Sequence, residues 1–288
     1  SINFAEVLDY SWPLMFNTLL GLATVSIDSF FIGYFRTVSE VGIYNAVAPI
    51  ARLTYIIPFS LSALLVPILV GLYAKKDDKS FYSVYNILNG WVFKFNLPLF
   101  IFILFFPKEL LFVLFGEDYV TGYIGLIILA SGFFIMYSFY VSREVLLALK
   151  KSRSVFYYSL LGVVLNIILA YLLVPAYGIV GAAVSSVICL LLISMLIFIS
   201  SYKLTKTFII GKKYFRITLI ALVSIIFVKL LSYVYNGYSF ISLFILWIVF
   251  FGIYGILLFI FKVFNEDDKM IIRDLFNSFK QKLGFEHN

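Results

Sequence analysis

Cysteine and histidine are almost absent from this chain. Its one cysteine, Cys189, sits inside an apolar run, and its one histidine, His287, is next to the last residue. Disulfide frameworks need paired cysteines, and Cys/His metal clusters or histidine-based catalysis need more of these side chains than the chain has. We therefore expect no metal, no cofactor and no catalytic residues, and we do not expect an enzyme.

Charge is also scarce, because Asp, Glu, Lys and Arg make up only 13% of the 288 residues. Soluble domains are about one quarter charged. Instead, 63% of the residues are hydrophobic and 20% are aromatic, with a mean hydropathy of +1.05. A helix needs about 20 apolar residues to cross a bilayer, so the chain has room for about eight crossings. The composition predicts an all-α integral membrane protein.

Apolar runs locate these crossings, separated by short connectors rich in turn residues. No connector is long enough for a soluble domain. After the last crossing, apolar residues recur at helical spacing among lysines, which predicts a short amphipathic helix on the membrane surface. We expect transmembrane helices at about 10–35, 43–73, 81–106, 122–148, 155–174, 179–200, 214–234 and 239–263.

The chain begins with Ser1 rather than methionine, and the first apolar run follows almost at once. The start also lacks the basic segment of a signal peptide. We therefore expect the chain to be the carboxyl-terminal part of a longer protein, or a processed chain.

Lysine and arginine lie mainly in alternate connectors. The first, third, fifth and seventh connectors hold only Arg36 and Lys108. The positive-inside rule therefore places both ends of the chain in the cytoplasm of a multi-pass cell-membrane protein. The net charge of +7 follows from this topology, so we expect membrane lipids and no nucleic acid as partners. The other connectors and the tail hold Lys75, Lys76, Lys79, Lys150, Lys151, Arg153, Lys203, Lys206, Lys212, Lys213, Arg216, Lys262, Lys269, Arg273, Lys280 and Lys282.

Asp28 and Arg52 fall inside predicted spans, where a charge costs about 2.5 to 3.5 kcal/mol and should face protein or water. Both lie roughly 10 to 14 Å below the outer surface. We expect either an ion pair that joins the first two helices or direct contact with a ligand. Each belongs to a stripe of small or polar residues on one helix face, namely Asn17, Gly21, Thr24 and Asp28 on the first span, and Asn45, Pro49 and Arg52 on the second.

Four further charged residues lie within or near the ends of the spans. Lys94 lies near the middle of the bilayer, about 20 Å from the cytoplasmic end, where it is either an anion ligand or the partner of an acidic residue or carbonyl. Arg143 and Glu144 project about 100° apart, so both can line a cavity only near its edge. Lys229 lies near the outer end of its span and can snorkel to water. The candidate cavity residues are Asp28, Arg52, Lys94 and Arg143.

Proline recurs at nine-residue steps in the second span, at Pro49, Pro58 and Pro67. Each proline removes a backbone hydrogen bond from a helix. The spacing therefore predicts a kinked or segmented helix, which serves either as a hinge or as an ordinary kink.

Several segments carry a family resemblance. The chain resembles the second half of polysaccharide flippases of the Wzx/RfbX type, in the multidrug/oligosaccharidyl-lipid/polysaccharide exporter superfamily. The resemblance lies in Ile27–Phe35 (IDSFFIGYF), Glu40–Ala46 (EVGIYNA), Phe115–Val120 (FGEDYV), Leu129–Gly132 (LASG), Leu161–Leu169 (LGVVLNIIL) and Val174–Ala183 (VPAYGIVGAA).

This resemblance implies two six-helix lobes around a central cavity, often followed by two more helices. Residues 1–200 would then be the second lobe, 201–264 the two additional helices and 265–288 a cytoplasmic amphipathic tail, with an amino-terminal lobe missing from this chain. The family implies that a polyprenyl-(di)phosphate-linked glycan moves to the outer leaflet by alternating access without ATP hydrolysis. Arg52, Lys94 and Arg143 would meet its diphosphate or acidic sugars.

Three alternatives stay open. A multidrug exporter of the same superfamily would favour an apolar cavity with one or two acidic cation-coupling residues, which Asp28 fits and Lys94 does not. A membrane-embedded glycosyltransferase or glycan ligase would need a catalytic acid or base, commonly in a long outer loop, and no outer connector here is both long and rich in such groups. A noncatalytic scaffold is the third.

Overall fold

The computed structural model describes residues 4–205, 211–233 and 238–263. This part of the chain is helical and contains no strand. The predicted amphipathic helix within 265–288 and the side chain of Thr24 lie outside the described residues. The elements are α1 (Phe4–Phe35), α2 (Val38–Arg52), the 3-10 turn η1 (Leu53–Tyr55), α3 (Ile56–Ala74), α4 (Asp78–Phe105), α5 (Pro107–Phe115), the 3-10 turn η2 (Glu117–Gly122), α6 (Tyr123–Ser138), α7 (Tyr140–Ala148), α8 (Ser152–Thr205), α9 (Lys212–Ser232) and α10 (Phe240–Ile260).

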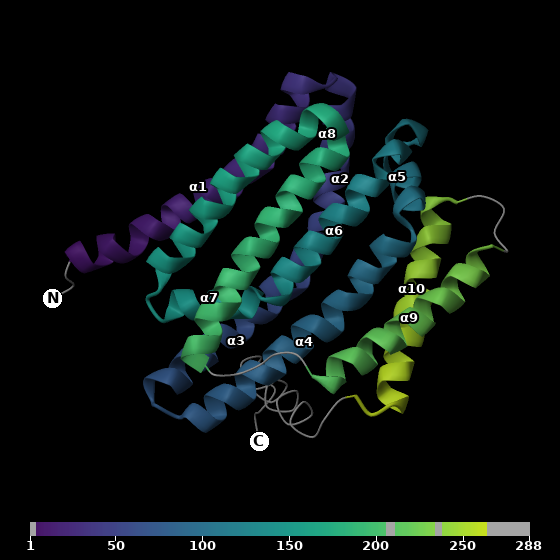
Figure 1. Ribbon diagram of the computed structural model, residues 1–288. Coiled ribbons are helices and arrows are strands. Elements are labelled where there is room, and N and C mark those ends of the chain that lie inside the picture. Colours follow the sequence, from purple (N-terminus) through teal and green to yellow (C-terminus); the bar gives the residue numbers. More distant parts are fainter. Residues whose placement is uncertain (1–3, 206–210, 234–237, 264–288) are drawn as a thin grey trace, which may run out of the picture.

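Seven helical stretches of the described chain are long and apolar enough to cross a membrane. One of them, Ser152–Leu204, is 53 residues long and contains a break at Gly178, with φ 52° and ψ −128°. The chain reverses at this break, so α8 forms two antiparallel crossings (Figure 1). With α8 counted twice, the prediction of about eight transmembrane helices is confirmed.

Two of the crossings are segmented. The second consists of α2, η1 and α3, and the break lies just before Pro58. A proline ring clashes with the carbonyl four residues earlier, here that of Thr54 in η1, so the predicted segmentation is confirmed. The fourth crossing is also broken, at Phe139 between α6 and α7, where the sequence predicts one continuous helix. No proline or glycine marks that break.

The connector after α4 also differs from the prediction, because it contains a short helix. Pro107 occupies the first turn of α5, where its missing N–H costs nothing, and Gly116 ends α5 with φ 100°. Here the sequence predicts only a connector.

Four clusters of buried apolar side chains hold the described helices together, and the smallest, made of Leu146, Val155 and Ile197, joins α7 to α8. Of the other three, one joins α1, α2, α6 and α8, and another joins α3, α4 and α7. The third packs α9 and α10 against α4 and α5, where these two helices lie together at one edge of the bundle (Figure 1).

Lys229 of α9 adds a polar contact to that edge. Its Nζ donates to the Phe105 carbonyl at 3.0 Å and to the Glu109 carboxylate at 2.6 Å, and lies 4.2 Å from the centre of the Phe106 ring. A cation is stabilised at a helix C-terminus, here that of α4. Lys229 thus binds the corner between α4 and α5, with 25% of its side chain still exposed.

Candidate functional site

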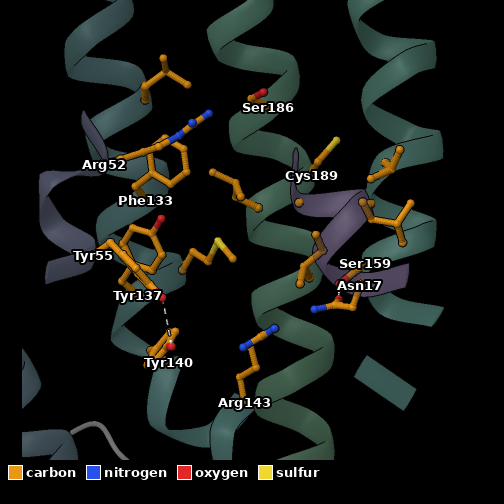
Figure 2. Close-up of a pocket in the computed structure, with 18 of the residues that line it drawn as sticks. Asn17, Arg52, Tyr55, Phe133, Tyr137, Tyr140, Arg143, Ser159, Ser186 and Cys189 are labelled. Atoms are coloured by element: carbon orange, nitrogen blue, oxygen red, sulfur yellow. Dashed lines mark hydrogen bonds between the residues drawn. The ribbon is translucent and has the colours of Figure 1, made fainter. Parts of the chain in front are cut away.

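A cavity of about 500 Å³ lies between α1, η1, α6, α7, the end of α2 and both halves of α8. Three of the four charged residues that the sequence singled out line it, namely Asp28, Arg52 and Arg143. Figure 2 shows Arg52 near one end of this cavity and Arg143 near the other. The structure thus brings into one cavity three charges whose sequence positions range from 28 to 143.

Asp28 is the centre of a polar cluster in the cavity wall, and its side chain is only 2% exposed. The hydroxyl of Tyr44 donates to its carboxylate, and that of Ser186 donates to the same oxygen at 2.5 Å. Asn166 donates its Nδ2 to the other carboxylate oxygen at 3.4 Å and to Ser186 at 3.1 Å. These partners come from α2 and from the two halves of α8, so Asp28 joins four helical segments.

Arg52 is the last residue of α2, and its guanidinium carbon lies 5.4 Å from the centre of the Phe133 ring. Of the two alternatives for Arg52 and Asp28, the ion pair does not form between these two described residues. Their charges act on each other only at longer range. The neutral donors of Tyr44, Ser186 and Asn166 already occupy the carboxylate.

Arg143 lies on α7 at the other end of the cavity. Its Nη1 is 2.6 Å from Oε1 of Glu144, with 23% and 24% of the two side chains exposed. Only Arg143 of this pair lines the cavity. This agrees with the expectation that residues 100° apart share a cavity only at its edge.

One wall of the cavity is aromatic, and the sequence analysis did not identify it. Phe133 and Tyr137 of α6 are stacked with ring centres 5.6 Å apart, and Tyr55 of η1 lies 5.2 Å from Tyr137. The hydroxyls of Tyr55 and Tyr140 are 3.4 Å apart. Phe133, Tyr137 and Tyr140 follow at steps of four and three residues, the spacing of one helix face, which is the signal that could have found them.

The opposite wall contains small and polar residues. Asn17, Gly21 and Asp28 of the predicted stripe on α1 all line the cavity, and Asn17 accepts a hydrogen bond of 2.6 Å from Ser159. In the second predicted stripe only Arg52 lines it. Asn45 instead accepts a hydrogen bond of 2.7 Å from Ser29, which joins α1 to α2.

Lys94 does not line this cavity. Its side chain is fully buried on α4, and its backbone carbonyl accepts a hydrogen bond of 2.7 Å from Tyr254 of α10. The backbone of Lys94 therefore belongs to the region where α10 packs on the bundle.

The cavity combines two guanidinium groups, a row of aromatic rings and several hydroxyl or amide groups. Guanidinium binds phosphate or carboxylate in bidentate fashion, and aromatic faces pack against apolar surfaces. Within the described residues, no cluster of three or more His, Cys, Asp or Glu side chains could hold a metal ion. The arrangement is suited to an anionic ligand that also carries ring or hydrocarbon surface.

Comparison with known proteins identifies related sequences. A family model described as MatE matches residues 13–172. The chain is 26% identical over 184 residues to the "Probable low-salt glycan biosynthesis flippase Agl15" of Haloferax volcanii, which is 64% of this chain and 39% of that protein. It is 27% identical over 186 residues to the "Capsular polysaccharide biosynthesis protein CapF" of Staphylococcus aureus, covering 64% of this chain and 46% of that protein. The matched region is thus less than half the length of either relative.

Solved structures show the same fold. Lipid II flippase MurJ in its inward closed conformation matches with a TM-score of 0.70 at 18% identity, over 95% of this chain and 56% of that one. A MOP superfamily transporter from Pyrococcus furiosus matches with a TM-score of 0.57 at 15% identity, over 77% of this chain and 54% of that one. These likenesses confirm the predicted exporter fold.

Proposed function

Since the chain belongs to the MatE family, we propose that it is part of a carrier that flips a polyprenyl-linked oligosaccharide or polysaccharide precursor across a cell membrane by alternating access. The names of the two sequence relatives support this proposal. The observation that carries it is the cavity, which places Arg52 and Arg143 along a row of aromatic side chains inside a membrane-spanning bundle.

Each part of the cavity has a role in this proposal. Arg52 and Arg143 bind the diphosphate or acidic sugars, because arginine keeps its charge even where water is scarce. The rings of Tyr55 and Tyr137 pack against the apolar faces of sugar rings. Asn17 on the opposite wall offers amide hydrogen bonds to sugar hydroxyls.

The proposal extends to the topology and the mechanism class. Both ends of the chain lie in the cytoplasm, which the distribution of lysine and arginine between connectors supports. The protein acts as a carrier rather than an enzyme, so no glycan bond is made or broken in the cavity. Residues 1–200 form the substrate-binding lobe and residues 201–264 an accessory pair of helices.

A second candidate is an exporter of small molecules coupled to a cation. Asp28 supports it, because this carboxylate is buried in a membrane-spanning bundle and lines the same cavity as the arginines. Such an exporter would change cellular resistance to cationic dyes such as ethidium and leave the surface glycan unchanged.

Replacement of Arg52 tests the proposed function. In source cells that lack the chromosomal copy, we expect Arg52→Gln to lower surface glycan per folded carrier about tenfold or more, and Arg52→Lys to keep part of it. Lys108→Gln is the control, since Lys108 is exposed and lies over the Tyr123 ring outside the cavity. Normal export per carrier in Arg52→Gln would contradict the proposed site.

A further inference from the structure

The guanidinium groups of the two cavity arginines differ in the side chains that they contact. Arg52 lies over the Phe133 ring and forms no ion pair within the described part of the chain. Arg143 is bound at 2.6 Å by Glu144, its neighbour in the sequence. One guanidinium is therefore open to an incoming anion, whereas the other already holds a carboxylate.

The geometry of the pair between Arg143 and Glu144 allows another anion to replace the Glu144 carboxylate. Adjacent residues on a helix project about 100° apart, so the pair lacks the stacked arrangement of an i,i+4 pair and the arginine has to bend toward its neighbour. About a quarter of each side chain remains exposed. Glu144 has no other hydrogen-bond partner among the described residues. The carboxylate can thus leave Arg143 without breaking any further contact.

We propose that Glu144 is an internal counter-anion that occupies Arg143 in the empty cavity and is displaced by the phosphate of the bound substrate. This inference rests on the proposed function and assigns a role to a residue that does not itself line the cavity. Exchange of one anion for another keeps the Arg143 guanidinium paired, and the displaced Glu144 carboxylate, 24% exposed, is solvated by water. It also weakens substrate binding, which allows the carrier to release its cargo.

Binding of a simple prenyl diphosphate tests this role. The protein, expressed from its complete gene, is placed in nanodiscs of neutral phosphatidylcholine, and the dissociation constant of farnesyl diphosphate is measured. We expect Glu144→Gln to tighten binding roughly three- to fivefold, the effect of removing one partly exposed competing ion pair. Arg143→Gln should weaken binding, and adding Glu144→Gln to it should change nothing more. Glu144→Asp, which keeps the charge, is the matched control and should stay close to the wild type.

Three further ligands separate charge from other effects. Farnesol lacks the anion, so its binding should not change in Glu144→Gln. Inorganic diphosphate lacks the prenyl chain, and phosphatidylglycerol in the disc offers a lipid phosphate instead. A similar gain in affinity in Glu144→Gln for farnesyl diphosphate, inorganic diphosphate or phosphatidylglycerol supports the role of Glu144. Of these three, the ligand that binds most tightly identifies the source of the anion.

The outcomes distinguish this inference from the proposed function. If wild-type protein binds farnesyl diphosphate and Arg52→Gln weakens that binding, but Glu144→Gln has no effect or acts equally without Arg143, only the role of Glu144 is overturned. If neither the wild type nor Glu144→Gln binds any of the phosphates, the proposed anion site and this inference both fail. Binding is expressed per folded protein, so a variant with low yield still gives a result.

Discussion

Asp28 shows how a buried charge in this chain is stabilised by neutral donors rather than by an opposite charge. Its depth and its stripe on α1 could be predicted from the sequence, and both are consistent with its place in the cavity. Its partners could not be predicted, because Tyr44, Asn166 and Ser186 reach it from segments whose rotation depends on packing between helices. Residue spacing gives a helix face but not the helix opposite that face.

Removal of Asp28 should therefore destabilise the protein through its donors. Asp28→Ala leaves the hydroxyls of Tyr44 and Ser186 without their buried acceptor, at a cost of about 1 to 3 kcal/mol each. We expect a lower midpoint of thermal unfolding in detergent, and a smaller loss for Asp28→Asn, which keeps an acceptor oxygen.

The double variant Asp28→Ala/Tyr44→Phe provides the control for this mechanism. Phenylalanine removes one of the stranded donors, so the double variant should recover part of the lost stability. Strictly additive losses would show that the hydrogen bonds to Asp28 are not what Asp28→Ala disrupts.

Lys94 marks the limit of arguments from membrane depth. Its depth suggests a place in a substrate cavity, but the side chain is fully buried on α4 and does not line the cavity. Arg143 lies nearer the end of its span and does line the cavity. Depth alone therefore does not separate residues that face the cavity from residues that face the next helix.

At the scale of elements, helix breaks could be predicted where they have a local chemical cause. Pro58 accounts for the break between α2 and α3 because its ring excludes the preceding turn from regular helix. The break at Phe139 has no such residue, and it lies where Tyr140 contacts Tyr55 of the other broken crossing. That break coincides with a contact to a residue 85 positions away, which no local pattern records.

Gly178, which reverses α8, allows a sharp test at this scale. Its φ of 52° and ψ of −128° are strained for other residues, and a Cβ there would overlap the Glu40 carboxylate. We expect Gly178→Ala to lower stability by about 1 to 3 kcal/mol, measured as a lower unfolding midpoint and a smaller folded yield. Gly255→Ala in α10 is the matched control, because no atom lies within 4 Å of its added Cβ. Equal yields of the two variants would contradict the role of Gly178 in the turn.

At the scale of the whole molecule, the number and order of crossings could be predicted closely, because the hydrocarbon core of the bilayer sets the same physical requirement for every span. Each span must be apolar and about 20 residues long, whatever it packs against. The cavity is less predictable, since it forms where seven different segments leave space between them. The sequence therefore predicts the set of helices well and predicts only part of the cavity lining.

Orientation in the membrane is the remaining property of the whole molecule that the sequence predicts. The connector between α3 and α4 and the turn within α8 lie at opposite ends of the bundle (Figure 1). Lys75 is exposed in the first, among several lysines, and Tyr177 is 64% exposed beside the second.

Because positive connectors stay in the cytoplasm, we expect Tyr177→Cys, and not Lys75→Cys, to react with an impermeant maleimide in intact cells. Both variants are made with Cys189→Ser, which removes the one cysteine of this sequence. Both should react once the cells are permeabilised, which shows that each thiol is accessible. Labelling of Lys75→Cys from outside would reverse the topology and place the Arg143 end of the cavity at the outer face.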